Sequence, residues 1–249
     1  MIKKVKEHFD LKTYKYDVGT KTNIHKVSFF FKNYTRDSLK DKKILFLDFE
    51  FSKEYNIYEM GGLILQNNKI IKTFFKEFKL PDDNSIFSFD KKRYYPLPNN
   101  YNKNRIKLNS SKILKLVDSV DIVVCHNYVA EIKCLLKLRF PNRDYNSNNC
   151  ELIKTGKIIC TNYSFCNKYF KGEFNLSEFS NSNISKRMGW TVDLKSKHIF
   201  VKNKKLDIDF KVRPPEAFFS AENNDLHNSF FDSVVTLSNF LSLTGIHLN

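Results

Sequence analysis

The chain is short of acidic residues and has no long apolar run. Its 249 residues hold 27 Asp and Glu against 42 Lys and Arg. No stretch reaches the roughly 18 consecutive apolar residues that a bilayer span needs, so we expect no association with the membrane. The first residues, MIKKVKEHFDLK, are basic, but no apolar segment follows them. We therefore expect no signal peptide and a cytoplasmic location.

Cysteine is also scarce, and no C-x-x-C pair is present. The five cysteines are Cys125, Cys134, Cys150, Cys160 and Cys166. The first two lie in apolar patterns, where a free cysteine behaves as a small hydrophobic residue. This usage excludes a disulfide framework and is typical of a reduced, intracellular protein. A zinc site built from the last three cysteines and a distant His is an alternative, but the spacing does not match the usual ligand patterns.

The excess of basic residues gives the chain a formal net charge of +15. A charge of this size favours a polyanionic partner such as nucleic acid. The alternative is a composition effect, since the chain is rich in Lys, Asn, Ile, Phe and Tyr, as AT-rich coding would produce anywhere. Charge alone leaves both interpretations open.

The chain divides into a basic N-terminal extension, residues 1–42, and one domain, residues 43–249. In the extension VSFFF is a candidate strand, and we expect the whole segment to pack on the domain or to be tethered to it. With 41% hydrophobic residues, the chain is long enough to bury one sizeable core. Apolar periodicity begins at residue 44 and recurs to the C-terminus, which argues against disorder.

The pattern from residue 44 predicts an antiparallel meander followed by alternating helices and strands. Strands are expected at Ile44–Phe51, Tyr58–Leu65 and Ile70–Phe78, with a turn at Asn67-Asn68, because Asn tolerates positive φ. The remaining expected elements, in chain order, are a loop over 81–107, a helix capped by Ser110 or Ser111 and ending near Ser119, a strand at Asp121–Cys125, a helix at Tyr128–Leu138, a polar loop over 141–157, a strand at Ile158–Cys160, helices at Thr161–Phe170 and Leu176–Met188, a poorly periodic segment over 191–225, and a helix from Ser229 to Leu243. This order predicts an α/β domain in which helices cover both faces of a mixed sheet.

Two carboxylates interrupt the first apolar strand, ILFLDFEF. Asp48 and Glu50 are two residues apart, so they point to the same face of the strand. Carboxylates in apolar surroundings repel one another and are poorly solvated. A divalent cation is the simplest partner that would keep them ionised, since Mg²⁺ is commonly bound by one or two carboxylates. The alternative is an edge strand with its polar face in solvent.

Two further segments place acids at the start of helices. In DIVVCHNYVAEIKCLL, His126-Asn127 follow a strand and Glu131 lies in the first turns of the next helix. In LHNSFFDSVV, Asn228 or Ser229 can cap the last helix, with His227 before it and Asp232 in its first turns. Taken singly, each has an ordinary explanation, because acids are favoured near helix N-termini.

The order of these motifs resembles the DnaQ-like 3′–5′ exonucleases of the DEDDh branch, which have an RNase H-like fold. The resemblance covers roughly residues 43 to 244. Asp48 and Glu50 match the first motif, Glu59-Met60-Gly61 the E-I-G of the second strand, and His227 with Asp232 the third motif. Two positions depart from the pattern: Glu131 stands where the family has Asp, and Ser52-Lys53-Glu54 replace the usual Thr-Gly step.

The resemblance implies a metal-dependent 3′–5′ exonuclease that releases nucleoside 5′-monophosphates from DNA or RNA. Two Mg²⁺ or Mn²⁺ ions would be held by Asp48, Glu50, Glu131 and Asp232, with His227 as the general base. The substrate would have a free, single-stranded or overhanging 3′ end. The family also suggests a homodimer or a larger complex. The alternative is a nucleic-acid-binding or scaffold protein on an impaired exonuclease fold, with Glu131 as the mark of that loss.

Residues beside the motifs are expected to touch the substrate. Phe51, Ser52 and Asn127 are candidates for contacts with the terminal nucleotide. Cations and aromatics interleave in DKKRYYPLPNNYNKNRIK and in NKYFKGEF, a mixture that suits single-stranded nucleic acid. A solvated, Lys- and Asn-rich loop is the alternative for both segments.

Overall fold

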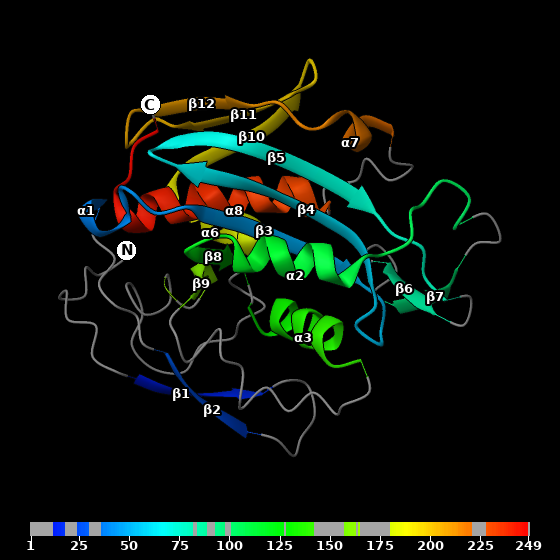
Figure 1. Ribbon diagram of the computed structural model, residues 1–249. Coiled ribbons are helices and arrows are strands. Elements are labelled where there is room, and N and C mark those ends of the chain that lie inside the picture. Colours follow the sequence, from blue (N-terminus) through cyan, green and yellow to red (C-terminus); the bar gives the residue numbers. More distant parts are fainter. Residues whose placement is uncertain are drawn as a thin grey trace.

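The computed structural model describes residues 12–17, 24–29, 36–81, 84–88, 93–97, 101–126, 128–141, 157–162, 164, 180–220 and 228–248 (Figure 1). Its largest element is a five-stranded mixed sheet with the order β5-β4-β3-β8-β9. The strands are β3 (Ile44–Phe51), β4 (Ile57–Gln66), β5 (Lys69–Glu77), β8 (Ile122–Cys125) and β9 (Ile158–Cys160). The first three are antiparallel, whereas β8 and β9 run parallel to β3. This is the architecture that the resemblance to RNase H-like exonucleases implies, and it confirms the predicted mixed α/β class.

Strand β3 is the central strand, which explains its nearly continuous apolar sequence. Its side chains alternate between two cores: Leu45 and Leu47 pack in the cluster that contains α2 (Ser110–Asp118) and α3 (Tyr128–Arg139). Phe46, on the other face, packs in the cluster that contains α8 (Ser229–Thr244). Helices therefore cover both faces, and the alternative of a solvent-exposed edge strand for Asp48 and Glu50 is wrong.

The local signals for turns and caps were mostly correct. Asn67 and Asn68 have φ of 51° and 60°, as predicted for the hairpin between β4 and β5. Asn228 caps α8 by accepting from the backbone N–H of Phe230 at 2.9 Å. The cap of α2 is a correction, because Asn109, and not Ser110 or Ser111, accepts from the backbone N–H of Lys112 at 3.0 Å.

Two segments that were expected to be irregular contain strands. The 81–107 segment includes a hairpin, β6 (Ser85–Ser88) and β7 (Arg93–Pro96). The 191–225 segment follows α6 (Asn181–Met188) and forms a three-stranded antiparallel sheet with a short helix: β10 (Trp190–Lys195), β11 (His198–Asn203), β12 (Ile208–Val212) and α7 (Glu216–Ser220). Its turns use non-glycine residues at positive φ, Ser196, Lys197 and Asp207. Without glycine or proline at these turns, the sequence carried no signal that separates the strands.

The remaining expectations fall partly outside the described residues. The helix predicted at Thr161–Phe170 falls mostly outside them, as do Cys150 and Cys166. The predicted start of the Leu176–Met188 helix is wrong, because Ser180 caps the helix by accepting from the backbone N–H of Asn183 and the helix begins at Asn181. Cys125, Cys134 and Cys160 are buried. In the expected extension, β1 (Lys12–Asp17) pairs with β2 (Ile24–Phe29), and α1 (Arg36–Leu39) follows. The division at residue 42 stays a prediction. No helix in the described ranges has the length and apolar character to cross a membrane.

Helix α8 lies unusually close to β4 at its N-terminal end. A Cβ atom on Gly61 would stand 2.1 Å from the backbone nitrogen of Phe230, so only glycine fits here. Two residues earlier on β4, the buried carboxylate of Glu59 accepts from the backbone N–H of Ser229 at 2.7 Å. The first turn of α8 therefore packs directly against the Glu-x-Gly motif of β4.

Replacing Gly61 with Ala should destabilise the protein by about 3 kcal/mol or more, because the methyl group collides with backbone that cannot rotate away. The matched control is Gly245→Ala at the C-cap of α8, which has φ of 70° and no atom within 4 Å of the added Cβ. That change should cost only about 1 kcal/mol of backbone strain. Urea denaturation measures both, and equal losses would contradict the close-packing interpretation.

Candidate active site

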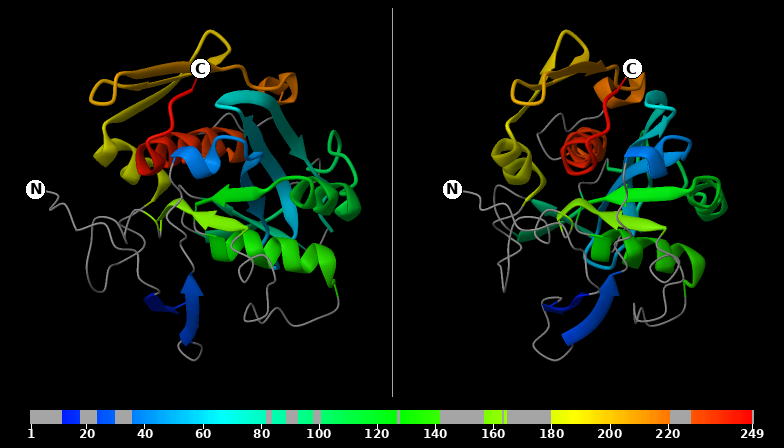
Figure 2. Two further views of the ribbon diagram at one scale, coloured as in Figure 1. Left: turned by 60° about the vertical axis from the view of Figure 1, so that its left-hand side comes forward. Right: turned by 90° about the vertical axis from the view of Figure 1, so that its left-hand side faces the viewer.

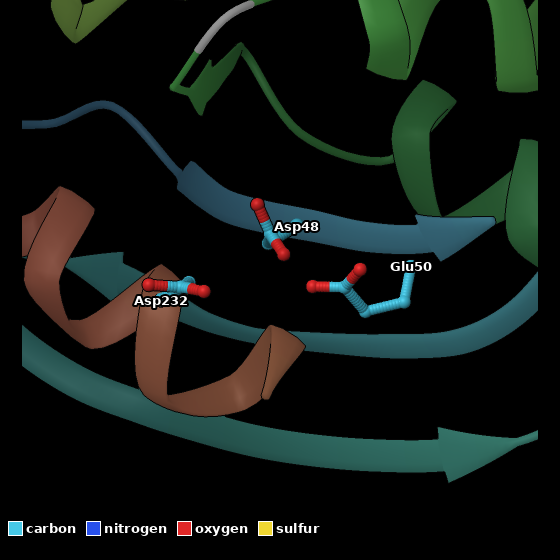
Figure 3. A group of neighbouring side chains, drawn as sticks. All are labelled: Asp48, Glu50 and Asp232. Atoms are coloured by element: carbon cyan, nitrogen blue, oxygen red, sulfur yellow. The ribbon is translucent and has the colours of Figure 1, made fainter. Parts of the chain in front are cut away.

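Three of the predicted acids meet between β3 and α8. Asp48 and Glu50 project from the same face of β3, and Asp232 faces them from the first turn of α8 (Figure 3). One carboxylate oxygen from each of the three lies within 4.8 Å of the others. All three are partly accessible. Residues 184 positions apart in the chain thus form one group.

Ionisation of this group is unfavourable in the folded protein. Burial raises the pKa of Asp48 well above its usual range, and the neighbouring charges of Asp232, Glu50, Glu131 and Glu59 raise it further. The pKa of Glu50 is raised by the same causes, and burial raises that of Asp232 to about 7. The carboxylates thus resist ionising together unless positive charge is brought among them.

Glu131, the fourth predicted acid, lies beside this group. It is in the first turn of α3 and is 4% exposed, and burial raises its pKa. Its charge contributes to the raised pKa values of both Asp48 and Glu50, which places it near them. Its oxygens are not in the three-residue group, and its Oε2 has no hydrogen-bond partner within the described residues.

The donor set suits a hard divalent cation. Carboxylate oxygens are the ligands that Mg²⁺ and Mn²⁺ prefer, and Mg²⁺ is usually held by one or two of them together with water and phosphate. A buried carboxylate oxygen without a hydrogen-bond partner is costly, and a cation beside the Glu131 Oε2 would remove that cost. The residues present therefore fit the implied metal ions.

Tyr58 is a site residue that sequence reasoning missed. Its hydroxyl donates a hydrogen bond to the Glu50 carboxylate, which partly offsets the rise in the pKa of Glu50. Tyr58 is the extra residue of a β-bulge, since Glu50 pairs with Glu59 and the next residue, Phe51, pairs with Ile57. Bulges redirect side chains. Strand alternation alone could not have found this contact.

The predicted substrate contacts Phe51 and Ser52 lead into a tight turn. The Phe51 ring stacks on Tyr55 with 5.3 Å between centroids and an interplanar angle of 20°. Ser52 is fully buried, and its hydroxyl donates to the Glu54 carboxylate at 2.9 Å. Ser52 thus shapes the turn from within, while Phe51 and Tyr55 form its surface.

The remaining predicted residues, His227 and Asn127, lie outside the described residues. Each directly follows or precedes a described one in sequence. His126 is buried, and its Nδ1 lies 2.9 Å from the Thr161 hydroxyl. His126, which follows β8, therefore contacts Thr161, which follows β9. Asn228, which follows His227, is buried as the cap of α8.

The chain was compared with protein-family models, characterised proteins and solved structures. No family model matches it, and no characterised protein matches it by sequence. Among solved structures it is similar to exonuclease X in complex with 5′-overhanging duplex DNA, with 13% identity and a TM-score of 0.47 over 80% of this chain and 90% of that one. It is also similar to a 3′-exonuclease in a structure of 3′-end-specific recognition of a histone mRNA stem-loop, with 13% identity and a TM-score of 0.45 over 84% and 66%. At this identity the likeness concerns the fold, and function has to be argued from the site.

The raised carboxyl pKa values predict an unusual pH dependence of stability in EDTA. Burial raises the pKa values of Asp232 and Glu59 to about 7 in the folded protein, from ordinary values of 3.8 and 4.5. Between pH 5 and 7 the native state keeps protons that the unfolded chain has released, so stability falls as pH rises, on the order of 1 kcal/mol per pH unit. Urea denaturation at pH 5, 6 and 7 measures this slope.

Two comparisons separate this effect from general acid sensitivity. Asp232→Asn should flatten the slope and be at least as stable as wild type at pH 7 in EDTA. Millimolar Mn²⁺ should raise the melting temperature of the wild type and not that of Asp232→Asn. Metal-free wild type that gains stability from pH 5 to 7 would overturn the assignment.

Removing the Tyr58 hydroxyl should weaken metal binding. Tyr58→Phe leaves the packing in place but removes the donor to Glu50, so the Mn²⁺ concentration for half-maximal thermal stabilisation should rise roughly tenfold. Tyr101→Phe is the control, because the Tyr101 hydroxyl has no hydrogen-bond partner within the described residues. Equal shifts in both variants would count against a role for the Tyr58 hydroxyl.

Proposed function

We propose that this protein is a metal-dependent 3′–5′ exonuclease that hydrolyses phosphodiester bonds from the 3′ end of DNA or RNA and releases nucleoside 5′-monophosphates. The observation that carries the proposal is the convergence of Asp48, Glu50 and Asp232 within 4.8 Å, with Glu131 buried beside them. These acids occur in the order of the exonuclease motifs. Structural acids rarely gather in this way, because each added charge raises the cost of the others.

In this proposal Asp48, Glu50, Glu131 and Asp232 would hold two Mg²⁺ or Mn²⁺ ions. Such ions supply a lowered pKa for bound water and stabilisation of the charge that develops on the phosphate and the leaving oxygen. Tyr58 orients the Glu50 carboxylate through its hydrogen bond. His227 would accept the proton of the attacking water, a suitable task for imidazole because its ordinary pKa is near neutrality.

The terminal nucleotide would lie on the Phe51–Tyr55 pair. Tyr55 has φ of 59°, an uncommon conformation for a bulky residue, and it holds its ring against Phe51. Lys133 also holds Tyr55 in place: its Nζ donates to the Tyr55 hydroxyl at 2.9 Å and lies 4.8 Å from the ring centroid. A rigid aromatic surface next to Glu50 suits base stacking. Asn127 is proposed as a further contact.

The identity of Glu131 favours a second candidate function, that of a catalytically impaired protein. It stands where the related enzymes have Asp, and its oxygens do not join the three-residue group. The additional methylene can misplace a ligand by about 1 Å, enough to impair catalysis. In that case the protein binds nucleic acid as an impaired exonuclease or scaffold subunit.

Digestion of single-stranded DNA and RNA, labelled at the 5′ end, tests the proposal. With Mg²⁺ or Mn²⁺ the wild type should give a stepwise ladder, and Asp48→Ala should reduce the rate about a thousandfold or more. Asp41→Ala is the matched control, because that acid is exposed and outside the group. The ratio of rates on DNA and RNA gives the sugar preference.

A ladder that survives in Asp48→Ala would refute this site assignment. Absence of a ladder with either metal, combined with retained binding of the oligonucleotide, would favour the impaired scaffold. Glu131→Asp then becomes decisive, since recovery of cleavage in that variant would show that the added methylene is what prevents catalysis.

A further inference from the structure

The three-stranded sheet β10–β12 packs against α8. One of its faces packs in the cluster around α8, and in the right-hand view of Figure 2 this helix is seen nearly end-on beneath the small sheet. The buried side chains of this inner face are Trp190, Ile199, Val201, Ile208 and Val212. Such anchoring gives the outer face a fixed orientation relative to the carboxylates.

The outer face is defined by the strand register. Asp193, Phe200 and Lys211 form one row across the three strands, and Lys195 pairs with His198 near the β10–β11 turn. Phe200 is 39% exposed at the centre of this face, with the His198 ring 6.3 Å away. An aromatic ring is thus displayed on a rigid sheet.

Large apolar side chains are exposed here more often than elsewhere. Seven are exposed in the described part of the chain, and three of them belong to this sheet and its turns. Phe200 lies on the outer face, Leu206 lies in the β11–β12 turn, and Leu194, which pairs with Ile199, lies on the inner face. Scattered single exposures need no explanation, so Phe200 indicates a contact surface through the charges that surround it.

The same surface is basic. Between Trp190 and Arg213 there are seven Lys and Arg against three Asp. Lys195 and Lys202 form exposed ion pairs with Asp193 and Asp209, at 3.7 and 3.6 Å. Exposed pairs of this kind are weak and exchange easily. The other cations, Lys197, Lys204, Lys205, Lys211 and Arg213, are exposed and form no ion pair with any described residue.

One end of this sheet leads toward the N-terminal end of α8, the helix that carries Asp232. The register puts Val212 beside Ile199, so Arg213 lies at the same end as the Ser196-Lys197 turn. There the chain enters α7, whose Phe218 ring lies 5.7 Å from that of Phe230 on α8. Phe230 precedes Asp232 by two residues, and Figure 1 shows α7 at the end of the small sheet.

We propose that the outer face of β10–β12 binds the single-stranded nucleic acid that leads 5′ from the end being trimmed. Lysine and arginine contact the phosphates, and Phe200 stacks on a base, which is how sequence-tolerant single-strand surfaces are built. The proposal rests on the proposed exonuclease function for the direction of the strand, but not for the binding itself. A surface outside the catalytic centre would keep a long substrate bound between successive cleavages.

The direct test is binding without catalysis. Fluorescence anisotropy in EDTA measures the affinity for a labelled single strand of about 30 nucleotides at several salt concentrations. The triple variant Lys197→Ser, Lys211→Ser, Arg213→Ser should bind at least tenfold more weakly, with the slope of log K against log salt reduced by about 2. Phe200→Ala should lose roughly fivefold or more with the slope kept, because stacking releases no ions.

The matched control removes three exposed lysines from other surfaces, Lys40→Ser, Lys112→Ser and Lys115→Ser. Equal weakening by the control triple would overturn the proposal in favour of diffuse attraction by net charge. Unchanged binding in both triples would overturn it as well. Circular dichroism verifies that each variant is folded, as expected for substitutions at exposed positions.

Cleavage gives a second readout that separates this inference from the proposed function. The ratio of kcat/KM for a 30-nucleotide substrate to that for a 6-nucleotide substrate should fall in the sheet variants and not in the control triple. If the protein cleaves nothing, the exonuclease proposal fails, while the anisotropy experiment still decides whether the sheet binds nucleic acid. A ratio that stays constant in an active enzyme would show that the strand does not follow this face.

Discussion

The close contact between α8 and β4 is the constraint on which the candidate site depends. Asp232 can face Asp48 and Glu50 only because Gly61 carries no side chain and lets the backbone of Phe230 approach. The contact is completed by Glu59, which accepts from the first turn of α8. A glycine and a buried acid on one strand thus decide the position of Asp232, which follows Gly61 by 171 residues in the chain.

In this arrangement the packing of α8 offsets the electrostatic repulsion among the carboxylates. The carboxylates raise one another's pKa values, so the group destabilises the metal-free fold. Apolar contacts of α8 offset this cost, among them Phe240, whose ring meets that of Phe46 edge-on at 5.2 Å. A polar contact adds to them: Asn181 on α6 donates to the backbone carbonyl of Asp232 at 2.8 Å. Functional sites commonly hold such strain where the surrounding core fixes the geometry.

The segments added to the central sheet carry exposed aromatic and cationic side chains. The turn after β3 presents Phe51 and Tyr55, and the β6–β7 hairpin presents Tyr94, whose pKa is raised by burial and then by Tyr55 and Glu54 nearby. The β10–β12 sheet presents cations around Phe200. Both additions present an exposed aromatic ring, and both emerge from segments whose sequences look irregular. Part of the excess positive charge of the chain is therefore displayed on the exposed strands and turns of the small sheet.

The sequence alone determined the alternation of β3, the meander with its Asn67-Asn68 turn, and the acids that share a face, because these depend on local geometry with a period of two or on single-residue φ preferences. It also indicated the order of the acidic motifs. Only the tertiary structure decided that Asp232 meets Asp48 and Glu50, that Tyr58 is turned onto Glu50 by a bulge, and that residues 190–212 form a sheet. These depend on close approach and on pairing between distant segments, for which a sequence without glycine or proline at its turns has no local signal.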